Sequence, residues 1–229
     1  RTANPASSKT DRPAKPKTGQ PNRPSPRNNP AQSPKTGPTG ANLSAGPTKK
    51  APKKDKMDAP DLFWPERQKI LVILAHPDDP EFFCGATLKR WALAGHDIRY
   101  CLLTCGDKGT NDPQLDPQEL CKLRHAEQEA AGAHFGVTAI HWLNQPDGYL
   151  VPSLALRREI VRIIRQEQPD VVVTCDPQNL FPSASYGLNH PDHRAAGQVV
   201  LDALFPAAGN HNFFPELLKE EGLAPHTPR

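Results

Sequence analysis

The sequence predicts an α/β protein, a Rossmann-like three-layer α/β/α domain with a mostly parallel sheet. Four short apolar segments rich in β-branched residues are typical of buried strands. Segments with helical periodicity or strong helix-capping signals alternate with them, and this alternation favours a parallel sheet with right-handed crossovers. The predicted strands cover residues 69–74, 97–103, 137–142 and 170–174.

Start and stop signals bound the helices that are expected after each strand. Asp116 and Ser153 are good N-cap residues, and Gly95 and Gly136 suit the left-handed position just past a helix end. Pro169 cannot continue a helix and ends the third one. The predicted helices cover residues 85–94, 117–135 and 154–168, and a fourth opens at about residue 191.

Residues 1–60 differ from the rest of the chain in composition. They hold 13 Lys and Arg against three Asp and Glu, 12 of the 27 Pro, and no aromatic residue. Such a segment cannot bury enough apolar surface to offset its ordering entropy, so we expect a disordered basic, Pro-rich leader. It could contact nucleic acid or an anionic surface, but without aromatic side chains for base stacking a solvated tail with no specific partner is favoured. Residues 61–229 form one predicted domain.

Membrane and redox signals are weak in this chain. The leader has no apolar core like that of a signal peptide, and nothing after it reaches the roughly 18 apolar residues of a membrane span. The cysteines are odd in number, several lie in apolar segments, and none form the paired spacing of a zinc ribbon. We therefore expect a reducing, cytoplasmic setting for the protein. The cysteines expected to be reduced there are Cys84, Cys101, Cys105, Cys121 and Cys175.

Two polar clusters follow the first and the fourth predicted strands. In doubly wound sheets these two strands are neighbours at the topological switch point, where ligands bind outside the carboxyl ends of the strands. The clusters are therefore expected to face each other across one crevice, although they lie far apart in the sequence. The first cluster contains His76, Asp78 and Asp79, and the second contains His190, Asp192 and His193.

These residue types suit a hydrolytic metal site. Catalytic zinc takes three protein ligands from His, Asp or Glu and leaves a position for water. Two His and one carboxylate meet that number, and the remaining carboxylate and His could take and give protons. Taken singly, Asp192 would most often cap a helix, and His76-Pro77 or Asp78-Asp79 would most often form a turn. Their joint occurrence at the ends of two apolar strands favours a metal site.

The motifs around these clusters resemble the LmbE-like family of zinc-dependent deacetylases, which includes the N-acetylglucosaminyl-phosphatidylinositol de-N-acetylases. The resemblance covers about residues 68–205. It rests on Ala75-His76-Pro77-Asp78-Asp79, Cys84-Gly85-Ala86-Thr87-Leu88, Ala94-Gly95-His96, Leu123-Arg124-His125-Ala126-Glu127, Phe135-Gly136-Val137, Pro146-Asp147-Gly148 and His190-Pro191-Asp192-His193.

The resemblance implies a role for each site residue. The zinc ligands would be His76, Asp79 and His193. Asp78 would be the general base for the attacking water, and His190 would stabilise the oxyanion or protonate the departing amine, with Asp192 tuning it. Arg124 and Asp147 would contact the substrate. Since relatives usually continue through a further strand and helix, the resemblance also implies that the domain is truncated at its C-terminus.

The expected function is a zinc-dependent hydrolase that removes the acyl group from an N-acyl amino sugar, with N-acetylglucosamine in a larger conjugate as the small-molecule partner. The alternatives are an amidase that cuts another C–N bond of such a conjugate, a non-catalytic metal- or sugar-binding module, and nucleic-acid binding through the leader. Fe²⁺ or another divalent ion could replace zinc at such a site. The sequence leaves the oligomeric state open, including a homo-oligomer.

Overall fold

A parallel four-stranded sheet with the strand order β3-β2-β1-β4 forms the centre of the domain. The computed structural model describes residues 64–182 and 187–228, so the predicted leader lies outside the described residues. The strands are β1 (Lys69–Leu74), β2 (Asp97–Thr104), β3 (Val137–Gln145) and β4 (Val171–Val173). β1 pairs with both β2 and β4, which confirms the predicted adjacency of the first and fourth strands.

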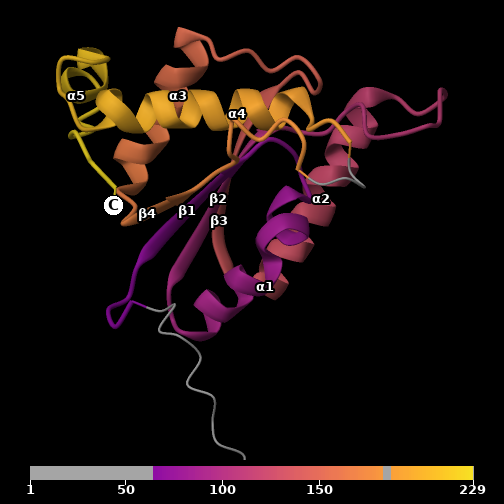
Figure 1. Ribbon diagram of the computed structural model, residues 1–229, viewed down its shortest axis with the longest axis horizontal. Coiled ribbons are helices and arrows are strands. Elements are labelled where there is room, and N and C mark those ends of the chain that lie inside the picture. The colour runs from indigo at the N-terminus through magenta and orange to yellow at the C-terminus, as the bar shows by residue number, and fades with distance from the viewer. Residues whose placement is uncertain (1–63, 183–186, 229) are drawn as a thin grey trace, which may run out of the picture. The chain divides into compact units, whose positions relative to one another are not determined.

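Helices cover both faces of this sheet, which confirms the three-layer α/β/α prediction. α1 and α2 lie on one face, and α3 and α4 on the other (Figure 1). The helices are α1 (Asp79–Leu93), α2 (Pro117–Phe135), α3 (Leu154–Glu167), α4 (Pro191–Asp202), the π-helical segment η1 (Ala203–Ala208) and α5 (Pro215–Lys219).

Alternate residues of β1 supply the two cores. Leu71 and Ile73 point into the cluster formed with α3 and α4, whereas Ile70 and Val72 belong to the cluster on the α1 and α2 side. All four side chains are fully buried. A strand that is apolar on both faces can only be central in such a sheet, which is why its carboxyl end opens onto the middle of the molecule.

The start of α1 differs from the prediction. The helix begins at Asp79, not at residue 85, with Pro80 in its first turn. Pro is well placed there because its fixed φ suits the first turn and its missing N–H would have no helical partner. The predicted helix covers residues 85–94, with the preceding residues expected as a turn. The helix start brings Asp79 to the end of β1, where its carboxylate accepts a hydrogen bond from the backbone N–H of His76 at 2.8 Å.

Both predicted N-caps are confirmed. The carboxylate of Asp116 accepts from the backbone N–H groups of Gln118 and Glu119, and the hydroxyl of Ser153 accepts from that of Leu156. These bonds satisfy amides that have no partner within the helix. Among the described residues, no helix is both long and apolar enough to cross a membrane.

The cysteines depart from the expectation of five reduced thiols. Cys105, just after β2, and Cys121 in the first turns of α2 form a disulfide, with their Cα atoms 5.2 Å apart. They are 16 residues apart in the sequence and meet only because the loop between them folds back onto the helix. Cys84, Cys101 and Cys175 are free. The cytoplasmic setting remains a prediction.

Candidate metal and active site

The two polar clusters meet at the carboxyl ends of β1 and β4. His76 follows β1, and His193 lies in the first turn of α4. The Nδ1 atom of His76 is 3.3 Å from the Nε2 atom of His193, although 117 positions separate them in the sequence. The pairing of β1 with β4 therefore produces the crevice that the topology predicted.

The side chains of His76, Asp79 and His193 lie next to one another, with one carboxylate oxygen of Asp79 facing each histidine. The Oδ2 atom of Asp79 is 3.4 Å from His76 Nδ1, its Oδ1 atom is 3.2 Å from His193 Nε2, and the two ring nitrogens are 3.3 Å apart. Zinc bound tetrahedrally at about 2.0–2.1 Å from such ligands needs ligand atoms about 3.3 Å apart. The arrangement of His76, Asp79 and His193 therefore fits a zinc ion.

His76 is held from its far side by two carboxylates. Its Nε2 atom is 3.1 Å from Asp147 Oδ1 and 3.3 Å from Asp192 Oδ2. A histidine that ligates a metal commonly donates its other N–H to a carboxylate, which sets the tautomer and the ring orientation. Here that donation would place the proton on Nε2 and leave the Nδ1 lone pair for the ion.

The structure places Asp192 against His76 rather than beside the ring of His190. Its carboxylate is fully buried and accepts from the backbone N–H groups of Gly148 at 2.7 Å and Leu150 at 3.2 Å. The backbone N–H of Asp192 donates to the Nδ1 atom of His190, and the negative charge of Asp192 raises the pKa of His190 against the larger opposing effect of burial. The link that this carboxylate makes is thus between α4, the 148–150 loop and His76.

Asp147 lies between the crevice and the interior. One oxygen faces His76, and the other accepts from the backbone N–H of Lys108 at 3.1 Å. It was expected to contact substrate, and it does border the crevice, but its polar partners are His76 and the loop after β2.

His193 is oriented by Asn189, a residue that the sequence motifs do not predict for the site. The amide oxygen of Asn189 lies 3.2 Å from His193 Nδ1, whereas the Nε2 atom of the same ring faces His76 and Asp79. Asn189 is buried, and its amide nitrogen donates to the backbone oxygen of Asn179. Asn189 stands four residues before His193, and this spacing is the feature of the sequence that could have predicted the contact.

Asp78 differs from the other carboxylates because its side chain is 68% exposed. Its backbone is left-handed, with φ 85°, a conformation that costs energy for a residue with a Cβ. Arg124 donates to its carboxylate at 2.7 Å, and its backbone N–H donates to the side-chain oxygen of Gln128 at 2.7 Å. Two side chains of α2 therefore hold Asp78 at the mouth of the crevice. Gln128 is not among the residues that the sequence motifs predict for the site.

His190 is exposed at the opposite wall. Its ring lies edge-to-face with that of His76, with 4.8 Å between the centroids. Since its Nδ1 atom accepts the N–H of Asp192, the proton of the neutral ring is on Nε2. Burial, followed by the positive charge of His76, lowers the pKa of His190, which favours this neutral donor form.

The carboxylates create a strong field for a cation. Burial lowers the pKa of His76, but Asp147 and Asp79 outweigh this effect and raise that pKa to about 10. Burial raises the pKa of Asp79, yet hydrogen bonds from His193 and His76 bring it far below its usual range. The hydrogen bond from His76 lowers the pKa of Asp147 to about 2. Without a metal ion, the site would hold a proton on His76.

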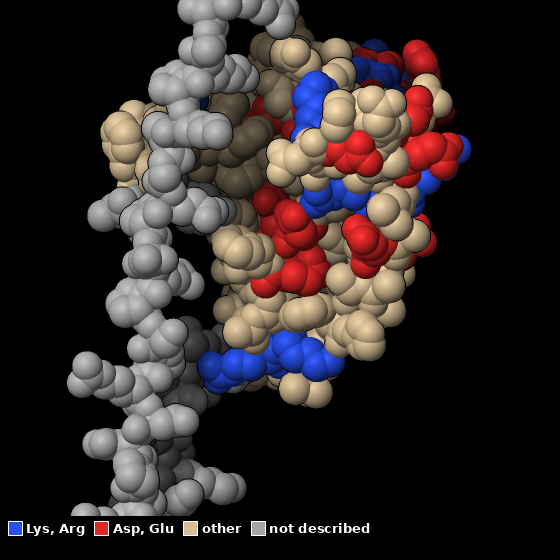
Figure 2. All heavy atoms as spheres, turned by 90° about the vertical axis from the view of Figure 1, so that its right-hand side faces the viewer, with Lys and Arg blue, Asp and Glu red and all other residues tan. Residues whose placement is uncertain are grey.

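Two cavities meet beside His193. One, of about 490 Å³, is the polar crevice that contains the site, and the Gly106–Gly109 loop, Arg124 and His190 line it. The other, of about 510 Å³, is mainly apolar, and Phe82 and Phe83 are among its walls. Figure 2 views the side of the molecule that lies on the right in Figure 1, where acidic and basic side chains lie close together.

The family of this chain follows from comparison with known proteins. The family model "PIG-L: GlcNAc-PI de-N-acetylase" matches residues 71–204, which is more than half of the chain and includes both polar clusters. The chain belongs to this family. The resemblance to LmbE-like deacetylases in the sequence is thereby confirmed.

Individual relatives agree with this assignment. The chain is 37% identical over 160 residues to diacetylchitobiose deacetylase of Thermococcus kodakarensis, a match that covers 70% of this chain and 57% of the relative. It is 30% identical over 174 residues to 1D-myo-inositol 2-acetamido-2-deoxy-alpha-D-glucopyranoside deacetylase of Kineococcus radiotolerans, covering 62% of this chain and 46% of that protein. The chain thus spans about half the length of these relatives.

A solved structure shows the same fold. The N,N'-diacetylchitobiose deacetylase of Pyrococcus horikoshii, in complex with its inhibitor MPG, superposes with a TM-score of 0.64 at 35% sequence identity. The match covers 70% of this chain and 57% of that chain.

Proposed function

We propose that this protein is a zinc-dependent N-deacetylase that removes the acetyl group from an N-acetylglucosamine-containing conjugate. The observation that carries the proposal is the cluster of His76, Asp79 and His193, in which one oxygen of Asp79 faces each histidine and the distances are 3.2–3.4 Å, beside the exposed carboxylate of Asp78. Relatives named as deacetylases of acetylated amino sugars support the reaction class.

His76, Asp79 and His193 would hold the ion, which when bound polarises the amide carbonyl and lowers the pKa of a water molecule. Asp147, Asp192 and Asn189 act on the same histidines from behind. They fix the orientations of both rings.

Asp78 would take the proton of the attacking water. Its carboxylate is exposed to the crevice, whereas Asp79, its neighbour, is buried and directed at the two histidines. Arg124 anchors one oxygen of Asp78 and leaves the other free to accept a proton. Since simple binding of a metal or sugar needs no such spare carboxylate, Asp78 favours catalysis over a non-catalytic module.

His190 would act on the oxyanion that forms during the reaction. With its proton on Nε2, the neutral ring can stabilise the oxyanion by donating a hydrogen bond. The proton that Asp78 takes from the water would then be given to the departing amine. The Nδ1 bond from the N–H of Asp192 keeps the ring in the tautomer that this role requires.

Lys108 and Arg124 give the crevice cationic walls and polar donors that suit sugar hydroxyls. The adjacent apolar cavity would take the part of the conjugate attached to the amino sugar. An amidase acting on another C–N bond of a related conjugate would use the same groups. The deacetylase and the amidase are distinguished by which substrate the protein hydrolyses. Fe²⁺ in place of zinc stays within this proposal.

The decisive experiment measures amine release from N,N'-diacetylchitobiose and from an N-acetylglucosaminyl inositol conjugate. We expect release by the purified protein, loss after chelation, and recovery with zinc. Asp78→Asn should lower kcat by about 10²- to 10⁴-fold while zinc content is unchanged, because it removes only the base.

Asp112→Asn, in the exposed loop after β2, is the matched control and should keep full activity. A wild-type protein that binds zinc but releases no amine from any N-acyl sugar would contradict the enzyme proposal and favour the binding module.

A further inference from the structure

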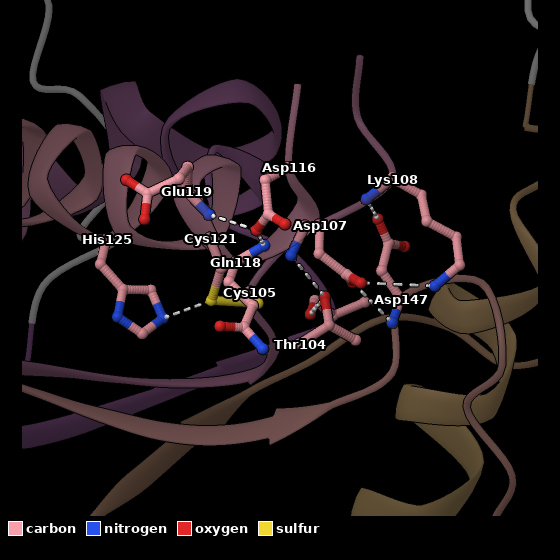
Figure 3. Close-up of a disulfide and its surroundings, with 12 residues drawn as sticks. Thr104, Cys105, Asp107, Lys108, Asp116, Gln118, Glu119, Cys121, His125 and Asp147 are labelled. Carbon is pink, nitrogen blue, oxygen red and sulfur yellow. Dashed lines mark hydrogen bonds and ion pairs between the residues drawn. A yellow bond between two sulfur atoms is a disulfide. The ribbon is translucent and has the colours of Figure 1, made fainter. Parts of the chain in front are cut away.

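A second group of metal-binding residue types lies outside the catalytic crevice. Cys105, Cys121 and His125 each offer one donor atom, and these atoms lie within 4.8 Å of one another. Cys105 follows β2, whereas Cys121 and His125 are one turn apart on α2 (Figure 3). None of the three takes part in the proposed deacetylation.

The geometry of the group suits a thiolate–imidazole site. The Sγ atom of Cys121 is 3.8 Å from the Nε2 atom of His125. A tetrahedral zinc ion, about 2.3 Å from sulfur and about 2.0–2.1 Å from nitrogen, places such atoms about 3.5 Å apart. Residues four apart on a helix lie on the same face, so one helix supplies two ligands without distortion.

The surroundings hold the imidazole in the form that binds metal. The ring of His125 stacks on Trp142 of β3, with 3.7 Å between the centroids and 23° between the planes. Burial lowers the pKa of His125, which favours the neutral ring. Cys105 is buried and Cys121 is half-buried, so a bound ion would be largely shielded from water.

In this structure the two sulfurs are joined, and metal binding requires their thiol form. A dithiol reductant supplies the two electrons and two protons. The Cys105–Cys121 bond breaks, two thiols form, and the reductant closes to its own disulfide. Each thiol then loses its proton on binding the ion.

We propose that the reduced protein binds a thiolate-preferring divalent ion of the zinc class at Cys105, Cys121 and His125, with water in the fourth position. This second site is distinct from the cluster of His76, Asp79 and His193, which contains no sulfur.

The second site would brace one wall of the crevice. Cys105 precedes Gly106, and Arg124 lies on α2 between Cys121 and His125 in sequence. The side chain of Arg124 packs closely on Gly106 and Gly109, so that a Cβ at Gly106 would lie 3.0 Å from its Nε atom and a Cβ at Gly109 would displace its guanidinium. An ion across β2 and α2 would therefore hold the Gly106–Gly109 loop against the helix that carries Arg124. The disulfide makes the same connection in the oxidised protein.

The test is a Co²⁺ titration of the full chain, without oxygen, after reduction with dithiothreitol and removal of the reductant. We expect two equivalents of Co²⁺ in the reduced protein and one in the oxidised protein. Sulfur-to-cobalt charge-transfer absorption in the near ultraviolet should appear only in the reduced protein. Because the cluster of His76, Asp79 and His193 lacks sulfur, this band is independent of whether the proposed deacetylase activity is found.

Variants assign the band to residues. Cys121→Ser and His125→Gln should lose it together with one equivalent of Co²⁺, and Cys84→Ser, which changes a free cysteine outside the group, should keep both. His125→Gln retains both sulfurs, so its disulfide and fold can be checked in the oxidised state. A reduced wild-type protein that takes up one equivalent with no charge-transfer band would overturn the proposal, as would an undiminished band in His125→Gln.

Discussion

At the scale of single residues, the site separates two adjacent carboxylates by backbone geometry. Asp78 has a left-handed backbone and is exposed, whereas Asp79 begins α1 and is buried against two histidines. Two adjacent residues thus have different roles: Asp78 is the candidate base and Asp79 is a candidate metal ligand. The strain at Asp78 is offset by the hydrogen bond that its carboxylate accepts from Arg124 and by the one that its backbone N–H donates to Gln128.

His76 determines how zinc affinity depends on pH. The pKa of its imidazole is raised to about 10 in the metal-free protein, so the ring is protonated near neutral pH and must release a proton when zinc binds. The logarithm of the affinity should rise by about one per pH unit up to about pH 10. Calorimetry of the oxidised protein in buffers of different ionisation enthalpy measures this proton release. Binding heats that are independent of the buffer would contradict the prediction.

The raised pKa of His76 also affects the stability of the metal-free protein. Its folded pKa of about 10 exceeds the ordinary value of 6.5, so the stabilisation is complete below pH 6.5 and is lost as the pH rises through about 10. Thermal unfolding in the presence of a chelator should therefore show a falling Tm over this window. His76→Gln should flatten the profile, and an equally steep profile in that variant would assign the effect to other groups.

Asp192 is expected to support metal binding from behind His76. Asp192→Asn removes the charge that faces His76 Nε2 but leaves an oxygen for the N–H of Gly148. Zinc affinity should fall by about 10- to 100-fold, as for other residues that orient a metal ligand. Asp202→Asn, at the far end of α4, is the matched control for equilibrium dialysis. Equal zinc affinities for the two variants would exclude this role.

At the scale of elements, the site depends on how closely α4 approaches the end of β4. Gly197, on the second turn of α4, faces the backbone of Cys175 and the ring of Pro177. A side chain there would push the helix away from the sheet and move His193 relative to His76. A glycine at position 197 is therefore needed to bring His193 close to His76.

Gly197→Ala tests this contact. A Cβ at position 197 would collide with the backbone oxygen of Cys175 and lie 3.0 Å from Pro177, so we expect a loss of about 1–3 kcal/mol in unfolding free energy and weaker zinc binding. Gly132→Ala, within α2, would meet Ile140 and Val137 at an ordinary 3.4 Å and gains helix propensity, so it should be neutral or stabilising. Urea unfolding of both variants checks the contrast. Equal effects would show that the approach of α4 can relax.

At the scale of the whole molecule, a buried arginine joins the sheet domain to its last segment. Arg165 of α3 is 1% exposed and donates to backbone oxygens of the segment that follows α4. Its acceptors are Ala207, Ala208, Asn210, Phe213 and Phe214. Burial lowers the pKa of this guanidinium, whose hydrogen bonds go to backbone carbonyl oxygens.

Arg165→Met should destabilise the protein by at least about 3 kcal/mol, because several buried carbonyl oxygens lose their donor at once. Arg162→Met, on the same helix, removes ion pairs with Glu159 and Glu221 at a partly exposed position and should cost less than about 1 kcal/mol. Chemical unfolding measures both. A similar cost for the two variants would mean that the segment after α4 rearranges without Arg165.

Much of the fold was readable from the sequence because local patterns determine it. Apolar, β-branched runs identified the four strands, and Asp116 and Ser153 identified two helix starts. The boundary of α1 was missed because Pro80 and the adjacent carboxylates suit both a turn and a first helical turn. Since strand order follows a general rule for parallel sheets, the meeting of His76 and His193 was also predictable.

The chemical groups of the site, and the sheet edge at which they meet, follow from residue types and strand patterns. The hydrogen-bond partners of these groups follow from the three-dimensional arrangement alone. It directs Asp192 and Asp147 to His76, Asn189 to His193, Gln128 to Asp78, and Cys105 to Cys121. The physical reason is that residue types and periodicity specify elements, whereas hydrogen bonds and disulfides between distant residues depend on loop paths and side-chain directions that no local pattern encodes.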